Sequence, residues 1–160
     1  MTDIDGTRET SGEALDLKLE VVVLPVSVDR ARGLYQRLGW RLCDGIVRGE
    51  DFPVVQLTPP GSACSIISGT GITSAAPGSA DSPILVVQDL EAARADLIGR
   101  GADVSEVFHE VGSVFHRGET EGRVPGPDPE GRSYASFASF SGLYGNGWLL
   151  QEIETRLPGR

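Results

Sequence analysis

The sequence predicts an α+β fold made of two successive βαβββ units. Three observations support this prediction: short β-branched runs alternate with helical stripes, the same order of elements occurs twice, and Gly- and Pro-rich turns separate the pieces. With 160 residues, 39% of them hydrophobic, the chain is long enough to bury a core without a metal or a disulfide. We expect a curved mixed sheet with the helices on its outer face.

The first unit is expected over residues 17–69. The run at residues 19–24 is β-branched and ends at Pro25, which suits the end of a strand. Ser27 is a candidate N-cap, and apolar residues then recur at helical spacing until Gly39 ends the helix. Three extended pieces follow, at residues 40–46, 52–58 and 63–68.

The second unit is expected over residues 83–155, after a Gly-, Ala-, Ser- and Pro-rich linker at residues 70–82. It begins with a strand at residues 84–87. Asp89 is the next candidate N-cap, and the helical stripe that follows ends at Gly101. Further extended pieces are expected from residue 104 to 109 and at residues 133–140 and 148–153.

An internal duplication supports this division. Ala31-Arg32 matches Ala93-Arg94 and Gly39 matches Gly101, always 62 positions apart. These matches are too few to prove a duplication, and the repeated order of elements, βαβββ twice, is the stronger argument. Each unit would leave one face of its sheet bare. Two units placed edge to edge would therefore form a cup that suits a small molecule.

Composition and charge exclude several classes of partner. The formal net charge is −9 and Lys18 is the single lysine, so nucleic acid and anionic membranes are poor partners. No run approaches the roughly 18 apolar residues of a membrane span. Residues 1–16 are polar and acidic, which predicts a disordered tail rather than a secretory signal and hence a cytoplasmic protein. Cys43 and Cys64 are expected to be ordinary thiols.

Three segments resemble the vicinal oxygen chelate superfamily, which includes glyoxalase I, bleomycin-resistance proteins and extradiol dioxygenases. Residues 21–31 (VVVLPVSVDRA) resemble its first strand and helix start, residues 34–40 (LYQRLGW) its helix end, and residues 141–153 its final hairpin. The resemblance covers about residues 17–155 and implies a cup-shaped fold and a homodimer. One departure is the family's Asp-Pro-Asp-Gly-Asn turn, which reads GLYGN at residues 142–146.

The resemblance also implies where a metal would bind. Metal-dependent members carry His, Gln or Glu early in the first strand and late in the third strand of each unit. Carried over by motif, these positions fall at Val21, Ile67, Leu149 and Ser82, or Ile84 if the register shifts by two. None of these side chains suits a divalent cation. We therefore predict a cup without a metal and a protein without a cofactor.

Strand alternation predicts which side chains line the cup. The expected lining residues are Val21, Val23, Val54, Gln56, Ser65, Ile67, Leu149 and Gln151. Gln56 and Gln151 stand out, because a glutamine that faces a core is costly unless it is paired. Each either bonds to backbone or solvent at the cup mouth, or orients a carbonyl or hydroxyl group of a ligand.

The two histidines, His109 and His116, lie in a Gly- and Pro-containing segment at residues 106–132, which we expect to be a lid loop. Each histidine is either a solvated or capping residue, or a general acid or base at the rim. Aromatic residues expected in the core are Tyr35, Trp40 and Trp148. Those expected to stack on a flat ligand are Tyr134, Phe137, Phe140 and Tyr144.

These features leave several functions open. The first is metal-free binding of a small, largely apolar or aromatic molecule, of the drug- or natural-product-resistance type. The second is a metal-free isomerase, cyclase or lyase of natural-product metabolism, in which His109 or His116 and a cup glutamine handle protons. The third is a metal-dependent glyoxalase or dioxygenase with unusual ligands. A purely structural role is the fourth.

Overall fold

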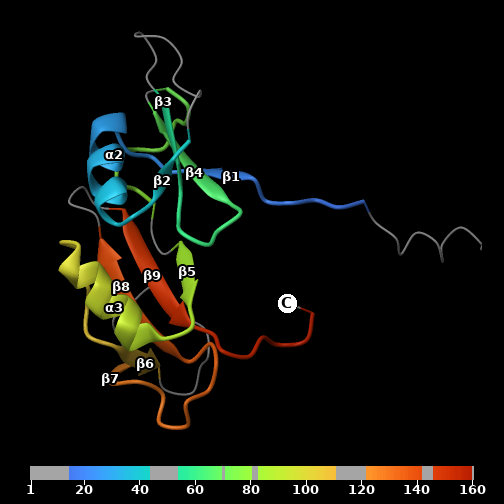
Figure 1. Ribbon diagram of the computed structural model, residues 1–160, viewed down its shortest axis with the longest axis vertical. Coiled ribbons are helices and arrows are strands. Elements are labelled where there is room, and N and C mark those ends of the chain that lie inside the picture. The colour runs from blue at the N-terminus through green and yellow to red at the C-terminus, as the bar shows by residue number, and fades with distance from the viewer. Residues whose placement is uncertain are drawn as a thin grey trace, which may run out of the picture.

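The strands form two mixed sheets, of four and five strands, and one helix packs on each (Figure 1). The computed structural model describes residues 15–43, 54–69, 71–80, 83–110, 122–141 and 146–159. In Figure 1 the two sheets lie one above the other, with both helices on the same side. The predicted α+β class, two units with helices on an outer face, is confirmed.

The first unit contains one helix and four strands in the predicted order. Its elements are β1 (Val21–Val23), α2 (Val28–Arg37), β2 (Arg41–Leu42), β3 (Val54–Thr58) and β4 (Ser65–Gly69). The sheet order is β1-β4-β3-β2, with β1 parallel to β4 and the other pairs antiparallel. Ser27 occupies the N-cap position of α2, and Gly39 follows the helix with a φ of 89°. Glycine adopts that left-handed conformation without strain.

The second unit repeats this order with one additional strand. Its elements are β5 (Ile84–Val87), α3 (Leu90–Gly99), β6 (Phe108–Glu110), β7 (Arg123–Pro125), β8 (Ser136–Ser141) and β9 (Gly147–Glu152). The sheet order is β5-β9-β8-β6-β7, and β5 is parallel to β9. Asp89 caps α3 by accepting a hydrogen bond from the Ala92 amide at 3.0 Å. Strands β6 and β7 pair with each other inside the segment 106–132, which we expected to be a loop.

One aromatic cluster joins the two units, and we define it as Tyr35, Trp40, Phe140 and Trp148. Tyr35 and Trp40 stack with ring centroids 4.5 Å apart, and the Trp148 ring stands edge-on to Trp40 at 5.3 Å. Trp148 Nε1 donates a hydrogen bond to the Tyr35 hydroxyl at 2.9 Å. Burial raises the pKa of Tyr35. The prediction that Tyr35, Trp40 and Trp148 belong to the core is confirmed.

The buried Asn146 ties the segment between the units to both of them. Its Oδ1 accepts a hydrogen bond from the Ala80 amide at 2.9 Å, and its Nδ2 donates to the Pro25 carbonyl at 3.3 Å. Residues 71–80, within the expected linker, contain no helix or strand. In the described part of the chain, neither α2 nor α3 has the length and apolar character that a membrane-spanning helix requires.

Candidate ligand-binding site

The face of the first sheet that points away from α2 carries five of the residues predicted to line the cup. The strand register pairs Val21 with Ser65 and Val23 with Ile67. It also pairs Gln56 with Ile67. Because side chains alternate along a strand, all five lie on one face. Alternate residues of β3 and β4, such as Leu57 and Ile66, point the other way into the core. We call the face of Val21, Val23, Gln56, Ser65 and Ile67 the open face.

The open face is apolar and partly accessible. Val23 is 41% exposed, and Val21, Gln56 and Ile67 are half-buried. The side-chain amide of Gln56 forms no hydrogen bond with any residue that the structure describes. An amide has two donor hydrogens and an acceptor oxygen. Gln56 is therefore available to hydrogen-bond to a molecule that covers this face.

A row of small polar side chains forms one end of the open face. The hydroxyl oxygens of Thr58 and Ser65 lie 2.7 Å apart, and Cys43 Sγ lies 3.3 Å from Thr58 Oγ1. These contacts connect β2, β3 and β4. Thr58 and Ser65 are both buried. The row satisfies its own hydrogen bonds, so Gln56 is the polar side chain of this face that has no hydrogen bond to the residues that the structure describes.

The second sheet places Leu149 and Gln151 on one face, but both side chains are buried. Leu149 packs with Phe108 and Phe137, whose rings stack 5.7 Å apart. Gln151 Nε2 donates a hydrogen bond to the Tyr134 carbonyl at 3.1 Å. This amide therefore bonds to backbone, which is one of the two alternatives that the sequence left open.

The prediction that aromatic residues of the second unit stack on a ligand was wrong for three of them. All three side chains are buried: the exposed fractions of Tyr134, Phe137 and Phe140 are 4%, 0% and 3%. The sequence around them, residues 133–140, shows no clean alternation from which the buried side could be read, and the core takes these large rings. Tyr144 and His116 lie outside the described residues.

The four positions implied for metal ligands do not fit a divalent cation. Val21 and Ile67 lie together on the open face, and Leu149 pairs with Ile84 in the second sheet. The side chains of Val21, Ile67, Leu149 and the alternative Ile84 are hydrocarbons, and Ser82 lies outside the described residues. Within the described ranges, no group of three or more His, Cys, Asp or Glu residues is placed to hold a metal ion.

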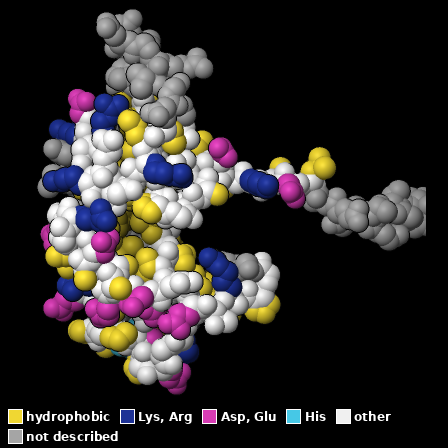
Figure 2. Space-filling model, in the orientation of Figure 1, with side chains coloured by type: hydrophobic (Ala, Val, Ile, Leu, Met, Phe, Trp, Pro, Cys, Tyr) yellow, Lys and Arg dark blue, Asp and Glu magenta, His cyan; other side chains and the backbone are white. Residues whose placement is uncertain are grey.

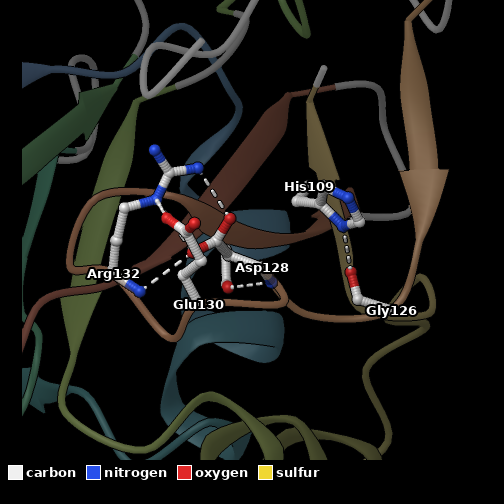
Figure 3. Close-up of polar contacts among 6 residues, drawn as sticks. His109, Gly126, Asp128, Glu130 and Arg132 are labelled. Carbon is white, nitrogen blue, oxygen red and sulfur yellow. Dashed lines mark hydrogen bonds and ion pairs between the residues drawn. The ribbon is translucent and has the colours of Figure 1, made fainter. Parts of the chain in front are cut away.

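His109 lies on a different face from the other predicted site residues. It pairs with Ser136, whereas its neighbour Phe108 pairs with Phe137, the partner of Gln151. Alternation therefore points His109 away from the face of Gln151. His109 Nδ1 donates a hydrogen bond to the Gly126 carbonyl at 2.8 Å (Figure 3), and this bond fixes the orientation of the imidazole ring. The structure does not bring His109 to either group of predicted cup residues.

Beside His109 lies a clasp that sequence reasoning missed, formed by Asp128 and Arg132 (Figure 3). The buried Asp128 carboxylate accepts hydrogen bonds from the Arg132 amide at 2.9 Å and from its guanidinium at 2.8 and 3.1 Å. The Asp128 amide donates to Ser136 Oγ at 2.9 Å. The Arg132 hydrogen bonds hold the pKa of Asp128 well below its usual range. The only available signal was an Asp and an Arg four positions apart in a Pro- and Gly-rich turn.

Replacing Asp128 with asparagine will destabilise the chain most at neutral pH and by a smaller amount in acid. A carboxyl group whose folded-state pKa is depressed stabilises the fold fully above its unfolded pKa, about 3.9 for Asp, and loses this effect progressively as the pH falls from there through the folded-state pKa. Urea unfolding of both proteins at pH 7 and pH 3 measures the change. Glu130→Gln is the control, because Glu130 is 73% exposed and contacts Arg132 only at 3.4 Å. An equal loss at both pH values would contradict the prediction.

A groove of about 630 Å³ lies where the two units meet. One wall comes from Trp40 and the turn between β3 and β4, and the other from β5 and α3. Figure 2 shows hydrophobic side chains gathered between the upper and lower parts of the molecule. Of the positions singled out from the sequence as lining the cup or as metal positions, Ile84 lines this groove, and the residues of the open face do not. The molecule therefore offers two separate apolar surfaces, the open face and the groove.

Comparison with solved structures shows where this fold occurs. TnmS3, an antibiotic binding protein from Streptomyces sp. CB03234, has a TM-score of 0.61 and 21% identity over 89% of this chain and 100% of its own. A glyoxalase/bleomycin resistance protein from the same organism has a TM-score of 0.57 and 22% identity over 84% and 100%. A glyoxalase/bleomycin resistance protein/dioxygenase superfamily member from Sphaerobacter thermophilus DSM 20745 has a TM-score of 0.59 and 18% identity over 87% and 99%.

These likenesses establish the fold. The chain has the fold of the glyoxalase/bleomycin resistance/dioxygenase superfamily, as the resemblance in its sequence implied. At these identities the comparisons show the fold alone, because this fold carries many chemistries. No family model and no curated protein matches the sequence.

Proposed function

We propose that this chain binds a small, largely apolar or aromatic organic molecule on the open face, without a metal ion. The observation that supports this most strongly is the combination of partly accessible apolar side chains with the unpaired amide of Gln56. Ligand sites are typically apolar surfaces with a few polar groups that fix orientation. The hydrocarbon side chains of Val21, Ile67 and Leu149, at three of the family ligand positions, support binding without a metal.

The compared proteins support a role in drug or natural-product binding, of the resistance type. TnmS3 is an antibiotic binding protein, and two other compared proteins belong to the glyoxalase/bleomycin resistance group. The net charge of −9 would also attract a cationic ligand at long range. The acid–base alternative, an isomerase, cyclase or lyase, gains no support from His109, which faces away from the cup residues. The cytoplasmic location and the homodimer stay predictions.

Replacing Gln56 with leucine will weaken binding of a flat aromatic probe. N-phenyl-1-naphthylamine is a suitable probe, because it is neutral, carries one N–H donor and fluoresces more strongly in apolar surroundings. The loss of one hydrogen bond, about 0.5–1.5 kcal/mol, should raise the Kd about two- to tenfold. Fluorescence titration of the wild type and the variant measures the change, and bleomycin serves as a competing ligand.

The matched control is Gln36→Leu, on the exposed side of α2. It makes the same chemical change away from the open face, so its Kd should equal that of the wild type. A wild-type protein that binds neither probe nor bleomycin would contradict the proposed function. An equal loss in both variants would remove Gln56 from the site.

A further inference from the structure

One buried donor group in the second sheet has no acceptor. Among the residues that the structure describes, Arg123 Nε is the one buried side-chain nitrogen or oxygen atom without a hydrogen-bond partner. Folded proteins pair nearly all such atoms, because a buried donor without an acceptor costs free energy. The exception at Arg123 therefore indicates an acceptor that the described part of the chain does not provide.

The Arg123 side chain is held against an aromatic ring. Arg123 belongs to β7, and its guanidinium carbon lies 4.2 Å from the centre of the Phe108 ring in the neighbouring strand β6. Phe108 in turn stacks on Phe137 of β8, with ring centroids 5.7 Å apart. A guanidinium on an aromatic face is attracted by the ring and stacks on it. The N–H groups of Arg123 are therefore presented in a restricted orientation.

The strand register places Arg123 on the face of the second sheet that the sequence predicted to line the cup. Arg123 lies two residues before Pro125, which pairs with Phe108. Phe108 pairs with Phe137, and Phe137 pairs with Gln151. Because paired residues share a face, Arg123, Phe108 and Gln151 lie on the same side of the sheet. We call this side the Gln151 face.

Arg123 is the side chain of the Gln151 face with a donor to spare. The Nε2 group of Gln151 already donates to the Tyr134 carbonyl at 3.1 Å. A guanidinium carries several N–H donors and no acceptor. The Arg123 side chain as a whole is only half-buried, so a bound molecule can reach it from solvent. The missing partner of Nε is therefore an acceptor oxygen of a ligand.

The charges around Arg123 favour a neutral acceptor over an anion. Glu110 is opposite Arg123 in the register and carries a negative charge on the same face. The net charge of −9 also repels an anion at long range. A carbonyl oxygen accepts a hydrogen bond without adding a second negative charge. The nearby Phe108, Phe137 and Leu149 are hydrocarbons, which suits a ligand whose remaining surface is apolar or aromatic.

We propose that Arg123 donates a hydrogen bond to the carbonyl oxygen of a neutral aromatic ketone or quinone that binds on the Gln151 face. The free protein carries the cost of the unpaired N–H group, and binding removes that cost. A molecule without the oxygen would leave the donor unpaired, so Arg123 selects for the carbonyl group. Figure 1 shows β6 and β7 at the opposite end of the molecule from β1 and β4. The proposal therefore does not rest on the function proposed for the open face.

The first test removes the Nε–H group and keeps the charge. In Arg123→Lys a methylene group replaces Nε, whereas the positive charge stays near the Phe108 ring. The probe is prodan, a neutral naphthalene with one ketone oxygen, whose emission moves to longer wavelength when that oxygen accepts a hydrogen bond. We expect the Kd for prodan to rise at least about tenfold, and the emission of bound prodan to move to shorter wavelength. Arg37→Lys, on the exposed side of α2, is the matched control and should match the wild type.

The stability of Arg123→Lys separates a ligand-binding role from a structural one. The variant should keep the urea midpoint of the wild type or raise it, because it removes a buried donor that has no acceptor. A variant that loses prodan binding and stability together would assign Arg123 to the fold and overturn the proposal. An unchanged Kd for prodan in the variant, or a wild type that does not bind prodan, would overturn it as well.

Two further probes test the chemical class of the ligand. N-phenyl-1-naphthylamine has no carbonyl oxygen, so its Kd should be the same in the wild type and in Arg123→Lys. If this probe fails to bind at all, the function proposed for the open face fails, while the prodan titration still decides the role of Arg123. The anilinonaphthalene sulfonate of the same skeleton adds a negative charge. If the sulfonate loses more affinity than prodan in Arg123→Lys, the site recognises an anion and the neutral class is overturned.

Discussion

Trp148→Ala will lower the free energy of unfolding by about 3–5 kcal/mol, the largest single-residue loss of stability that we expect. Trp148 is 4% exposed, and its ring contacts Tyr35, Trp40 and Phe140. Its indole N–H donates to the Tyr35 hydroxyl. Alanine would leave a cavity between the two units and an unpaired buried hydroxyl. Urea unfolding of the wild type and the variant measures the difference.

Two further variants separate packing from hydrogen bonding at this position. Trp148→Phe keeps most of the aromatic contacts but loses the N–H group, so it should cost clearly less than alanine. Tyr35→Phe removes only the acceptor and should cost about 1–3 kcal/mol, because the indole N–H is left buried and unpaired. The double variant Trp148→Phe/Tyr35→Phe should then cost less than the sum of the two single changes. Simple additivity would show that the hydrogen bond contributes nothing.

Local signals in the sequence predicted the elements and the open face. Asp89 caps α3, and Gly39 and Gly101 follow the helices with φ angles of 89° and 97°. These signals act within a few residues, so they can be read without knowledge of the fold. The same holds for the alternation in β1, β3 and β4, which placed Gln56 and Ile67 on one face.

Long-range pairing limited the rest of the prediction. The face of His109 depends on the register of β6 against Ser136 in β8, 27 positions away, and a one-residue slip would reverse it. The partner of Gln151 is the carbonyl of Tyr134, which has a φ of 72°, a conformation that few non-glycine residues adopt. Neither contact leaves a pattern in the sequence. The groove likewise depends on long-range packing, because its two walls come from different units.

Ile67→Glu will reduce the affinity for N-phenyl-1-naphthylamine at least about 100-fold, the largest effect on binding that we expect. Ile67 lies at the centre of the open face, paired with Val23 on one side and Gln56 on the other. A bound apolar molecule would strip water from the new carboxylate, and burying an unpaired charge costs several kcal/mol. The side chain is half-buried in the free protein, so the variant should remain folded.

The corresponding change in the groove identifies the surface that the ligand uses. Ala93→Glu places a carboxylate on the α3 wall of the groove, at a similarly half-buried position. If the probe binds to the open face, this variant should keep the wild-type Kd, whereas Ile67→Glu should not. The reverse result would move the ligand to the groove. Because the new carboxylate loses its water only where the ligand covers it, the variant that loses binding marks the surface that the ligand covers.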